Sequence, residues 1–156
     1  MIKPRNFTGL FLFLFFAILF IEVVMKKFIA AFGVDKDGNL TDGHFGDSEY
    51  FEIFSISENS IVLAEKRKNL KIVEKMHGDP NKAKAISALL SGVDVLVAFR
   101  MGPNILRMKK KFVPVIVGTR DKRMAKKLVL KNFSHILEEV EKEGEKNYIA
   151  IKNKEE

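Results

Sequence analysis

The chain of 156 residues contains no cysteine, and this absence removes several kinds of chemistry at once. Without a thiol it forms no disulfide and no thiolate metal site, so a thiolate-held iron–sulfur cluster is excluded within these residues. There is also no cysteine nucleophile, no Gly-x-Ser-x-Gly motif and no evident Ser–His pair. We therefore do not expect an enzyme that works by nucleophilic catalysis.

Aromatic residues are missing from the two most basic clusters, although basic residues exceed acidic ones by 27 to 20 and give a net charge of +7. Such an excess favours an anionic partner, such as a charged cofactor, a nucleic acid or an acidic membrane surface, or it only keeps the chain soluble. The clusters at residues 109–111 and 120–127 offer no stacking platform of the kind that single-strand binders use. We therefore do not expect nucleic acid as the partner, and a membrane-tethered or nucleic-acid-contacting basic module is the alternative function.

A long apolar run occupies residues 7–24, where only Thr8, Gly9 and Glu22 are not apolar. As a helix this segment would rise about 27 Å, at the short end for a bilayer core. No small-x-small cleavage site follows it, so we do not expect a cleaved signal peptide. Two interpretations stay open: a single-pass membrane anchor, or a start at Met25 that leaves residues 1–24 untranslated and the protein cytoplasmic.

After this run the pattern changes to short strands and amphipathic helices. Asp79 and Pro80 form a strong helix start, Gly92 suits the end of that helix, and Thr119 is the expected cap of a later one. We expect strands at residues 28–34, 50–57, 61–68, 93–99 and 113–117, and helices at residues 80–91, 103–111, 120–130 and 132–142.

Three strands joined by hairpins, followed by strand–helix–strand–helix, predict an α/β domain with three layers and a five-stranded mixed sheet. Right-handed crossovers and short connections suggest the strand order 3-2-1-4-5. This domain would occupy residues 25–131, after the hydrophobic segment at residues 1–24. Residues 132–156 would form a helical and charged C-terminal extension, in which residues 148–151 are at most a stray strand.

The first functional candidate is His44, which lies among glycines in a loop just before a strand, where a side chain is presented more easily than it is buried. In the predicted order the chain reverses between strands one and four, and ligands favour the crevice at such a switch point. The loop with His44 and Gly46 should therefore meet the loop with Met101, Gly102 and Asn104. The second loop opens a helix, whose free N–H groups suit an anion, and its glycine lets a ligand approach closely.

Plainer interpretations exist for each of the three histidines. His44 is equally compatible with a loop histidine that hydrogen-bonds the backbone. His77, beside Gly78, is a second exposed loop histidine, which is also compatible with an ordinary surface side chain. His135 falls in a helical pattern and is expected at the surface.

Two blocks of the sequence resemble a known family. The first comprises FIAAFGV at 28–34, DGHFG at 42–46 and YFEIF at 50–54, and the second comprises DVLVAFRMGPN at 94–104 and VPVIV at 113–117. In this order they resemble the nitrogenase iron–molybdenum cofactor-biosynthesis accessory domains of the NifX type, which are also found at the C-terminus of NifB-type proteins. The resemblance covers roughly residues 26–130.

This resemblance implies a ribonuclease H-like topology and a non-enzymatic carrier of an iron–sulfur-type metal cofactor, the iron–molybdenum cofactor or a precursor. His44 matches the histidine of the family's His-Phe-Gly motif and would be the metal ligand, with His77 as a second. The remaining cofactor contacts would be Gly46, Met101, Gly102 and Asn104. A client or cofactor-assembly protein would be the partner. Some family members carry cysteines that this chain lacks, so binding would be transient, or the ligand a different one.

A ribonuclease H-like fold also raises the hypothesis of a nuclease. Two-metal phosphoryl chemistry needs clustered carboxylates near the centre of the sheet, including one on the first strand. Residues 28–34 contain no carboxylate, and the acids that follow them lie in a loop. We therefore do not expect nuclease activity.

Overall fold

The computed structural model describes residues 7–70, 72, 76 and 78–153. These residues form six strands in one sheet, in the order β3-β2-β1-β4-β5-β6. β2 runs antiparallel to β1 and β3, whereas the neighbours β1–β4, β4–β5 and β5–β6 are parallel. The strands are β1 (Lys27–Val34), β2 (Tyr50–Ser57), β3 (Ser60–Lys68), β4 (Val95–Ala98), β5 (Val113–Val117) and β6 (Ile149–Ile151).

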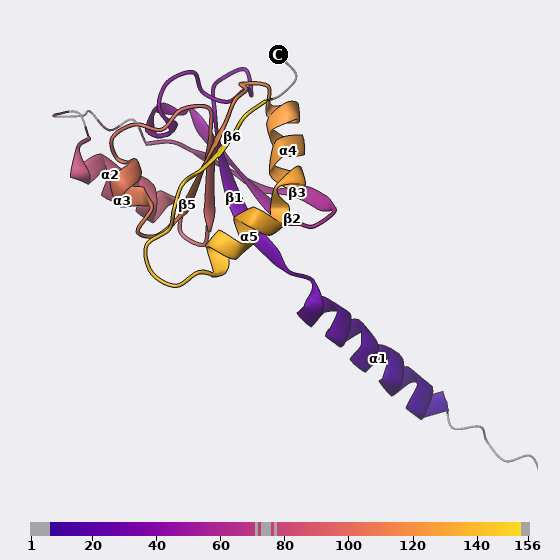
Figure 1. Ribbon diagram of the computed structural model, residues 1–156. Helices are drawn as coiled ribbons and strands as arrows, with labels where there is room; N and C mark the ends of the chain where they lie inside the picture. Colours follow the sequence, from indigo (N-terminus) through magenta and orange to yellow (C-terminus); the bar gives the residue numbers. More distant parts are fainter. Residues whose placement is uncertain (1–6, 71, 73–75, 77, 154–156) are drawn as a thin grey trace, which may run out of the picture.

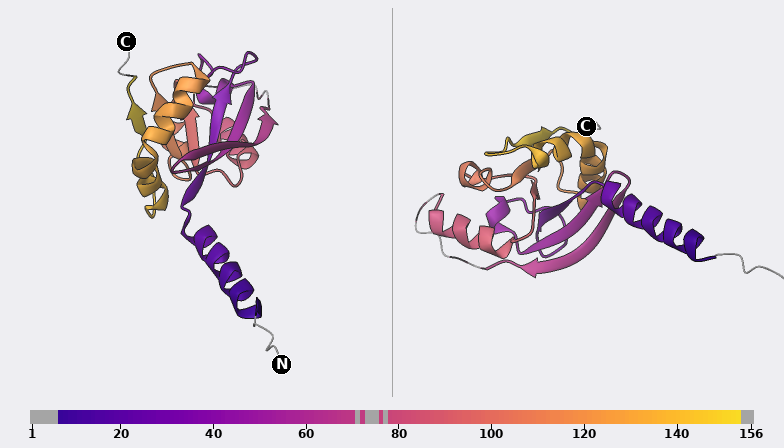
Figure 2. Two further views of the ribbon diagram at one scale, coloured as in Figure 1. Left: turned by 90° about the vertical axis from the view of Figure 1, so that its right-hand side faces the viewer. Right: turned by 90° about the horizontal axis from the view of Figure 1, so that it is seen from below.

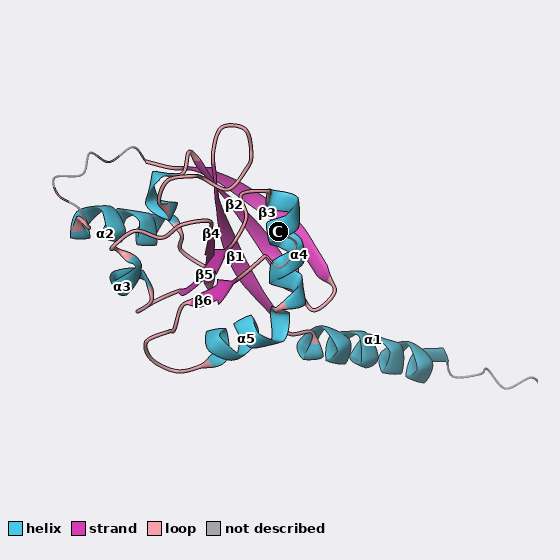
Figure 3. Cartoon of the chain, turned by 45° about the horizontal axis from the view of Figure 1, so that its top comes forward, coloured by secondary structure: helices cyan, strands magenta, loops and turns pink. Residues whose placement is uncertain are grey.

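Helices cover both faces of this sheet and produce three layers (Figures 1 and 2). The first face carries α2 (Pro80–Leu89) and α3 (Ile105–Met108), and the second carries α4 (Lys122–Lys131) and α5 (Phe133–Glu141). Figure 3 shows the strands in magenta between the helices in cyan. The sheet therefore divides the hydrophobic core into two halves, one beneath each pair of helices.

Apart from Lys27 at the start of β1, the central strands carry no charged residue, because both of their faces are covered. Every residue of β4 is buried, and so are most residues of β1. On the α4–α5 side, Phe28 stacks on Phe133 with ring centroids 5.3 Å apart, and Phe32 meets Phe54 edge-on at 5.0 Å. Each such pair adds about 0.5–1.5 kcal/mol beyond the burial of its area. These contacts tie α5 to the same core as the first two strands.

The predicted order 3-2-1-4-5 is confirmed, but the prediction of a five-stranded sheet is wrong. A sixth strand, β6, pairs in parallel with the outer side of β5 and buries Ile149 and Ile151. The sequence analysis allowed at most a stray strand at residues 148–151, because so short an apolar stretch is too brief to show an alternating pattern. Within the segment 132–156, α5 and β6 thus both pack on the sheet.

The helix caps follow the sequence signals in one helix and depart from them in another. Asp79 caps α2 by accepting a hydrogen bond in its first turn, and Gly92 follows the helix with a φ of +82°, as expected for a helix end. The predicted cap Thr119 is wrong for α4, because Asp121 takes that position. The Thr119 hydroxyl instead accepts a hydrogen bond from the Asp121 N–H at 3.1 Å. The carboxylate reaches the first turn of the helix directly, so it replaces the hydroxyl as the cap.

The apolar run forms α1 (Phe7–Val24), which projects away from the sheet (Figure 1). Within the part of the chain that the structure describes, no helix combines the length and the apolar character needed to cross a membrane. The 18 residues of α1 would rise about 27 Å, against a hydrocarbon core of roughly 30 Å.

Candidate functional site

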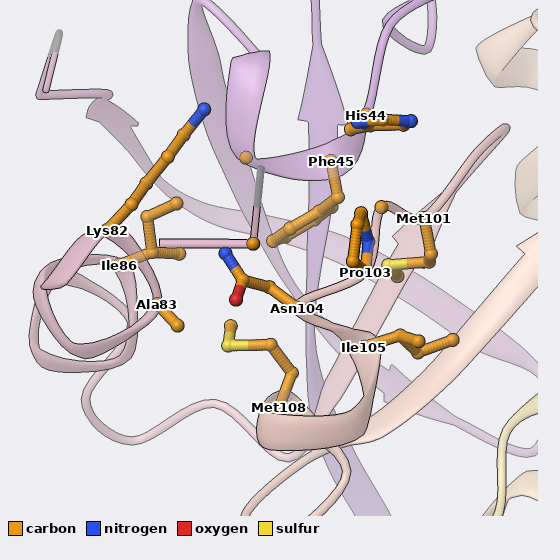
Figure 4. A pocket seen from close by; sticks show the side chains of 13 residues that line it. His44, Phe45, Lys82, Ala83, Ile86, Met101, Pro103, Asn104, Ile105 and Met108 are labelled. Carbon is orange, nitrogen blue, oxygen red and sulfur yellow. The ribbon is translucent and has the colours of Figure 1, made fainter. Parts of the chain in front are cut away.

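The two loops that the sequence analysis singled out meet at one edge of the sheet. β1 and β4 are parallel neighbours, so their carboxyl ends lie side by side. A hydrogen bond of 3.0 Å from the Phe45 N–H to the Arg100 carbonyl joins the two loops. Between them and α2 lies a small pocket (Figure 4). Its lining consists of His44, Phe45, Gly46, Gly78, Lys82, Ala83, Ile86, Met101, Gly102, Pro103, Asn104, Ile105 and Met108.

His44 lies directly over the backbone of Gly102. A Cβ atom at Gly102 would lie 2.7 Å from His44 Nδ1 and 2.9 Å from its Cγ, closer than real Cβ contacts come, so only glycine leaves room for the imidazole. The His44 side chain is 48% exposed. It makes no capping hydrogen bond to the short 3-10 helix η1 (Phe45–Asp47) that it precedes. The imidazole is therefore held in place yet accessible from solvent.

The residue after His44 fixes the loop from below. Phe45 is buried and packs against Phe51 with ring centroids 4.9 Å apart. Its carbonyl accepts a hydrogen bond of 2.8 Å from the Ser48 hydroxyl, which is buried as well. This anchoring agrees with the usual role of an aromatic residue under a loop, and it leaves His44 as the side chain that faces outward.

The second loop forms one wall of the pocket and also links α3 to α2 through hydrogen bonds. Met101 is half-buried in that wall. Asn104 donates a hydrogen bond of 3.3 Å to the Asp79 carbonyl and accepts one of 3.0 Å from Arg107, so its amide ties α3 to the start of α2. α3 has only four residues, fewer than the predicted helix 103–111. Its dipole is therefore too small to make the helix terminus an anion site on its own.

Lys82 is a pocket residue that the sequence analysis missed. Its side chain is only 10% exposed, and its Nζ lies 2.5 Å from Asp47 Oδ1. Asp47 in turn places its other carboxylate oxygen 4.0 Å from His44 Nδ1. Its position in the sequence could have identified it. Lys82 precedes Ile86 by four residues and therefore lies on the buried face of α2, where a lysine needs a charged partner.

The remaining histidines do not join this site in the described structure. His77 lies outside the described residues, so its predicted role as a second ligand stays a prediction. His135 is exposed on α5, as expected. Within the described ranges no three His, Asp or Glu side chains are grouped to hold a metal ion. Among the described residues, the pocket lining contains one imidazole, that of His44.

The enclosed part of the pocket is small. Its volume is about 40 Å³, a few times the roughly 10–15 Å³ that a cavity needs to hold one water molecule. Any larger ligand would lie at the mouth, against His44, rather than inside. The half-exposed position of the imidazole fits that geometry.

Comparison with known proteins shows which family the chain belongs to. No curated protein matches the chain. The model of the family described as dinitrogenase iron-molybdenum cofactor matches residues 25–132. The match begins two residues before β1 and includes both loops of the pocket. It covers well over half of the 156 residues, so the chain belongs to the dinitrogenase iron–molybdenum cofactor family.

Proposed function

We propose that this protein is a non-enzymatic carrier that binds an iron–sulfur-type metal cofactor, the iron–molybdenum cofactor or a precursor of it, at the mouth of the pocket. The observation that carries the proposal is the position of His44 over Gly102 in a chain of the family named for that cofactor. Neutral imidazole is a good ligand for iron and related metals. His44 would be the metal ligand, and Gly46, Met101 and Asn104 would form the adjoining wall.

The chemistry of such a cofactor suits a site with few protein ligands. In a preassembled cluster, bridging sulfides already satisfy most of the metal coordination, so the protein needs to add few ligands. The cluster is anionic, and the chain has a net charge of +7 with Lys82 in the pocket lining. No cysteine is available to hold the cargo through a thiolate, so attachment is expected to be exchangeable. Exchange is what delivery to a client or cofactor-assembly protein requires.

Two other functions receive no comparable support. The strand order is compatible with the ribonuclease H-like topology that the resemblance implies, yet β1 carries no carboxylate for two-metal chemistry. The basic helix α4 has lysines at its surface but no aromatic residue among them on which a base could stack. The carrier therefore remains the function that the site favours.

The decisive experiment is an anaerobic titration of the full chain with isolated iron–molybdenum cofactor, followed by visible absorbance. We expect saturable binding that His44→Ala abolishes. The matched control is His135→Ala, which removes an exposed histidine on α5 outside the pocket. Unchanged binding by His44→Ala would place the site elsewhere. A failure of the unaltered protein to bind would remove this cofactor from the proposal.

A further inference from the structure

A groove lies between α4 and β6, the strand at one edge of the sheet (Figure 2). Its volume is about 640 Å³, within the roughly 300–1,000 Å³ that is usual for binding sites, whereas the pocket beside His44 has about 40 Å³. α4 and β6 pack in the half of the core beneath α4 and α5, and the pocket lies beside α2 in the other half. The groove and the pocket are therefore on opposite sides of the sheet.

Three exposed lysines line this groove: Lys127, Lys131 and Lys152. Its lining, as far as the structure describes it, includes no aspartate or glutamate. Lys127 and Lys131 are four residues apart and so lie on one face of α4, where like charges repel each other. The carboxylate of Asp121 attracts Lys127 from the start of α4, outside the groove. An anion in the groove would offset the repulsion, so the lysines favour a negatively charged ligand.

β6 also presents a backbone edge beside this groove. The Ile151 carbonyl accepts a hydrogen bond of 2.9 Å from the Gly118 N–H, so the backbone groups of Ile151 face β5. Successive residues of a strand turn their N–H and C=O groups to opposite sides, so those of Ala150 face away from β5. Among the described residues no strand pairs with that side of β6. An extended segment of another chain can add to such an edge as a further strand.

We propose that this groove binds an extended acidic segment of a partner protein, which adds to the edge of β6 and places its carboxylates beside the three lysines. Apolar side chains of the segment would lie against Met124 and Leu128, which line the groove and are only partly buried. A nucleic acid would meet the amines but would use neither the apolar surface nor the strand edge. These two features therefore favour a peptide.

The inference goes beyond the carrier function and does not depend on it. Because the groove and the pocket are on opposite sides of the sheet, a partner can dock at β6 without approaching His44. Substitutions in the groove should therefore weaken the binding of an acidic segment and leave the cofactor titration unchanged. This separation allows each of the two proposals to fail without the other.

The probe is a short, end-capped, fluorescein-labelled peptide of alternating valine and glutamate, titrated with the full chain and followed by fluorescence anisotropy. A peptide with lysine in place of glutamate controls for the sign of the charge. One variant combines Lys127→Gln with Lys152→Gln. Its matched control combines Lys84→Gln with Lys110→Gln, which removes two charges from exposed positions that do not line the groove. Ala150→Pro removes the outward N–H, which proline tolerates on an edge strand. Unfolding midpoints verify that each variant is folded.

We expect saturable binding of the acidic peptide, which the groove variant weakens by about threefold to tenfold through the loss of two exposed charge pairs. The matched control should bind like the unaltered protein, and Ala150→Pro should not bind. Equal affinities for the two double variants, or no binding by the unaltered protein, would overturn the proposal. Binding of an oligothymidylate in place of the peptide would also overturn it, in favour of nucleic acid. If Ala150→Pro does not fold, the comparison of the two double variants decides.

Discussion

Replacing Gly102 by alanine isolates the contact that defines the site. The added Cβ would lie 2.7 Å from His44 Nδ1, whereas ordinary contacts of this kind begin at 3.4 Å, so the ring must retreat by about 0.7 Å (3.4 − 2.7). Gly102 is not among the glycines with positive φ, so alanine fits its backbone. The imidazole is half-exposed and can swing toward solvent, which avoids most of the roughly 1–3 kcal/mol that overpacking costs in a core.

Alanine also restricts the unfolded chain, which stabilises by about 0.4–1 kcal/mol. The two effects nearly offset each other, so we expect the free energy of unfolding of Gly102→Ala to change by less than about 1 kcal/mol. The position of the ring, however, should change. Cofactor binding should therefore weaken although the protein remains as stable as before.

Urea unfolding and a histidine-selective ¹H–¹⁵N spectrum measure these two quantities separately, with His44→Ala to assign the resonances. Gly43→Ala is the matched control, because its Cβ would come no closer than 3.5 Å to the Asp47 carboxylate in the same loop. If Gly102→Ala leaves both the His44 resonances and the cofactor titration unchanged, the imidazole does not lie over Gly102 and the proposed site is wrong.

Three further predictions concern the scaffold. Asp79→Ala should lower the free energy of unfolding by about 1 kcal/mol in urea, because it removes the cap of α2. Ile151→Ala should cost about 2–4 kcal/mol in the same assay if β6 is part of the folded sheet, and almost nothing if the strand is detached. The backbone N–H of Met124 donates to Asp121 and lowers the pKa of that carboxyl. The stabilisation from Asp121 should therefore be complete above about pH 4 and be lost as the pH falls through the lowered pKa, so the melting temperatures of Asp121→Ala and the unaltered protein should converge in acid.

The sequence was informative where a single physical rule governs a long segment. Continuous apolar runs identified β1, β4 and β5, since strands covered on both faces admit few polar residues. Parallel pairing of β1 and β4 then requires the loops that follow them to meet, which placed His44 near Gly102 without any knowledge of side-chain positions.

The parts that escaped prediction depend on tertiary contacts. β6 exists because β5 offers it a hydrogen-bonding edge and the core accepts its two isoleucines, and neither condition is visible in three residues. Lys82 looked like one of several lysines in a helix, since its burial arises from the η1 loop packed over its stem. The shortness of α3 was also missed, because no strong stop signal lies between Pro103 and Phe112.

The site combines rigid supports with exposed donors, and this division bears on how a carrier works. Phe45 and Met108, which hold the two loops in place, are buried in the half of the core beneath α2. His44, which would be the ligand of the proposed cargo, is about half-exposed. In the proposed function, the cargo would therefore bind and leave at the surface, without any opening of the core. It follows that substitution of His44 should change affinity while leaving the unfolding midpoint nearly unchanged, whereas truncation of Phe45 should lower both, since aromatic truncation in a core costs about 3–5 kcal/mol.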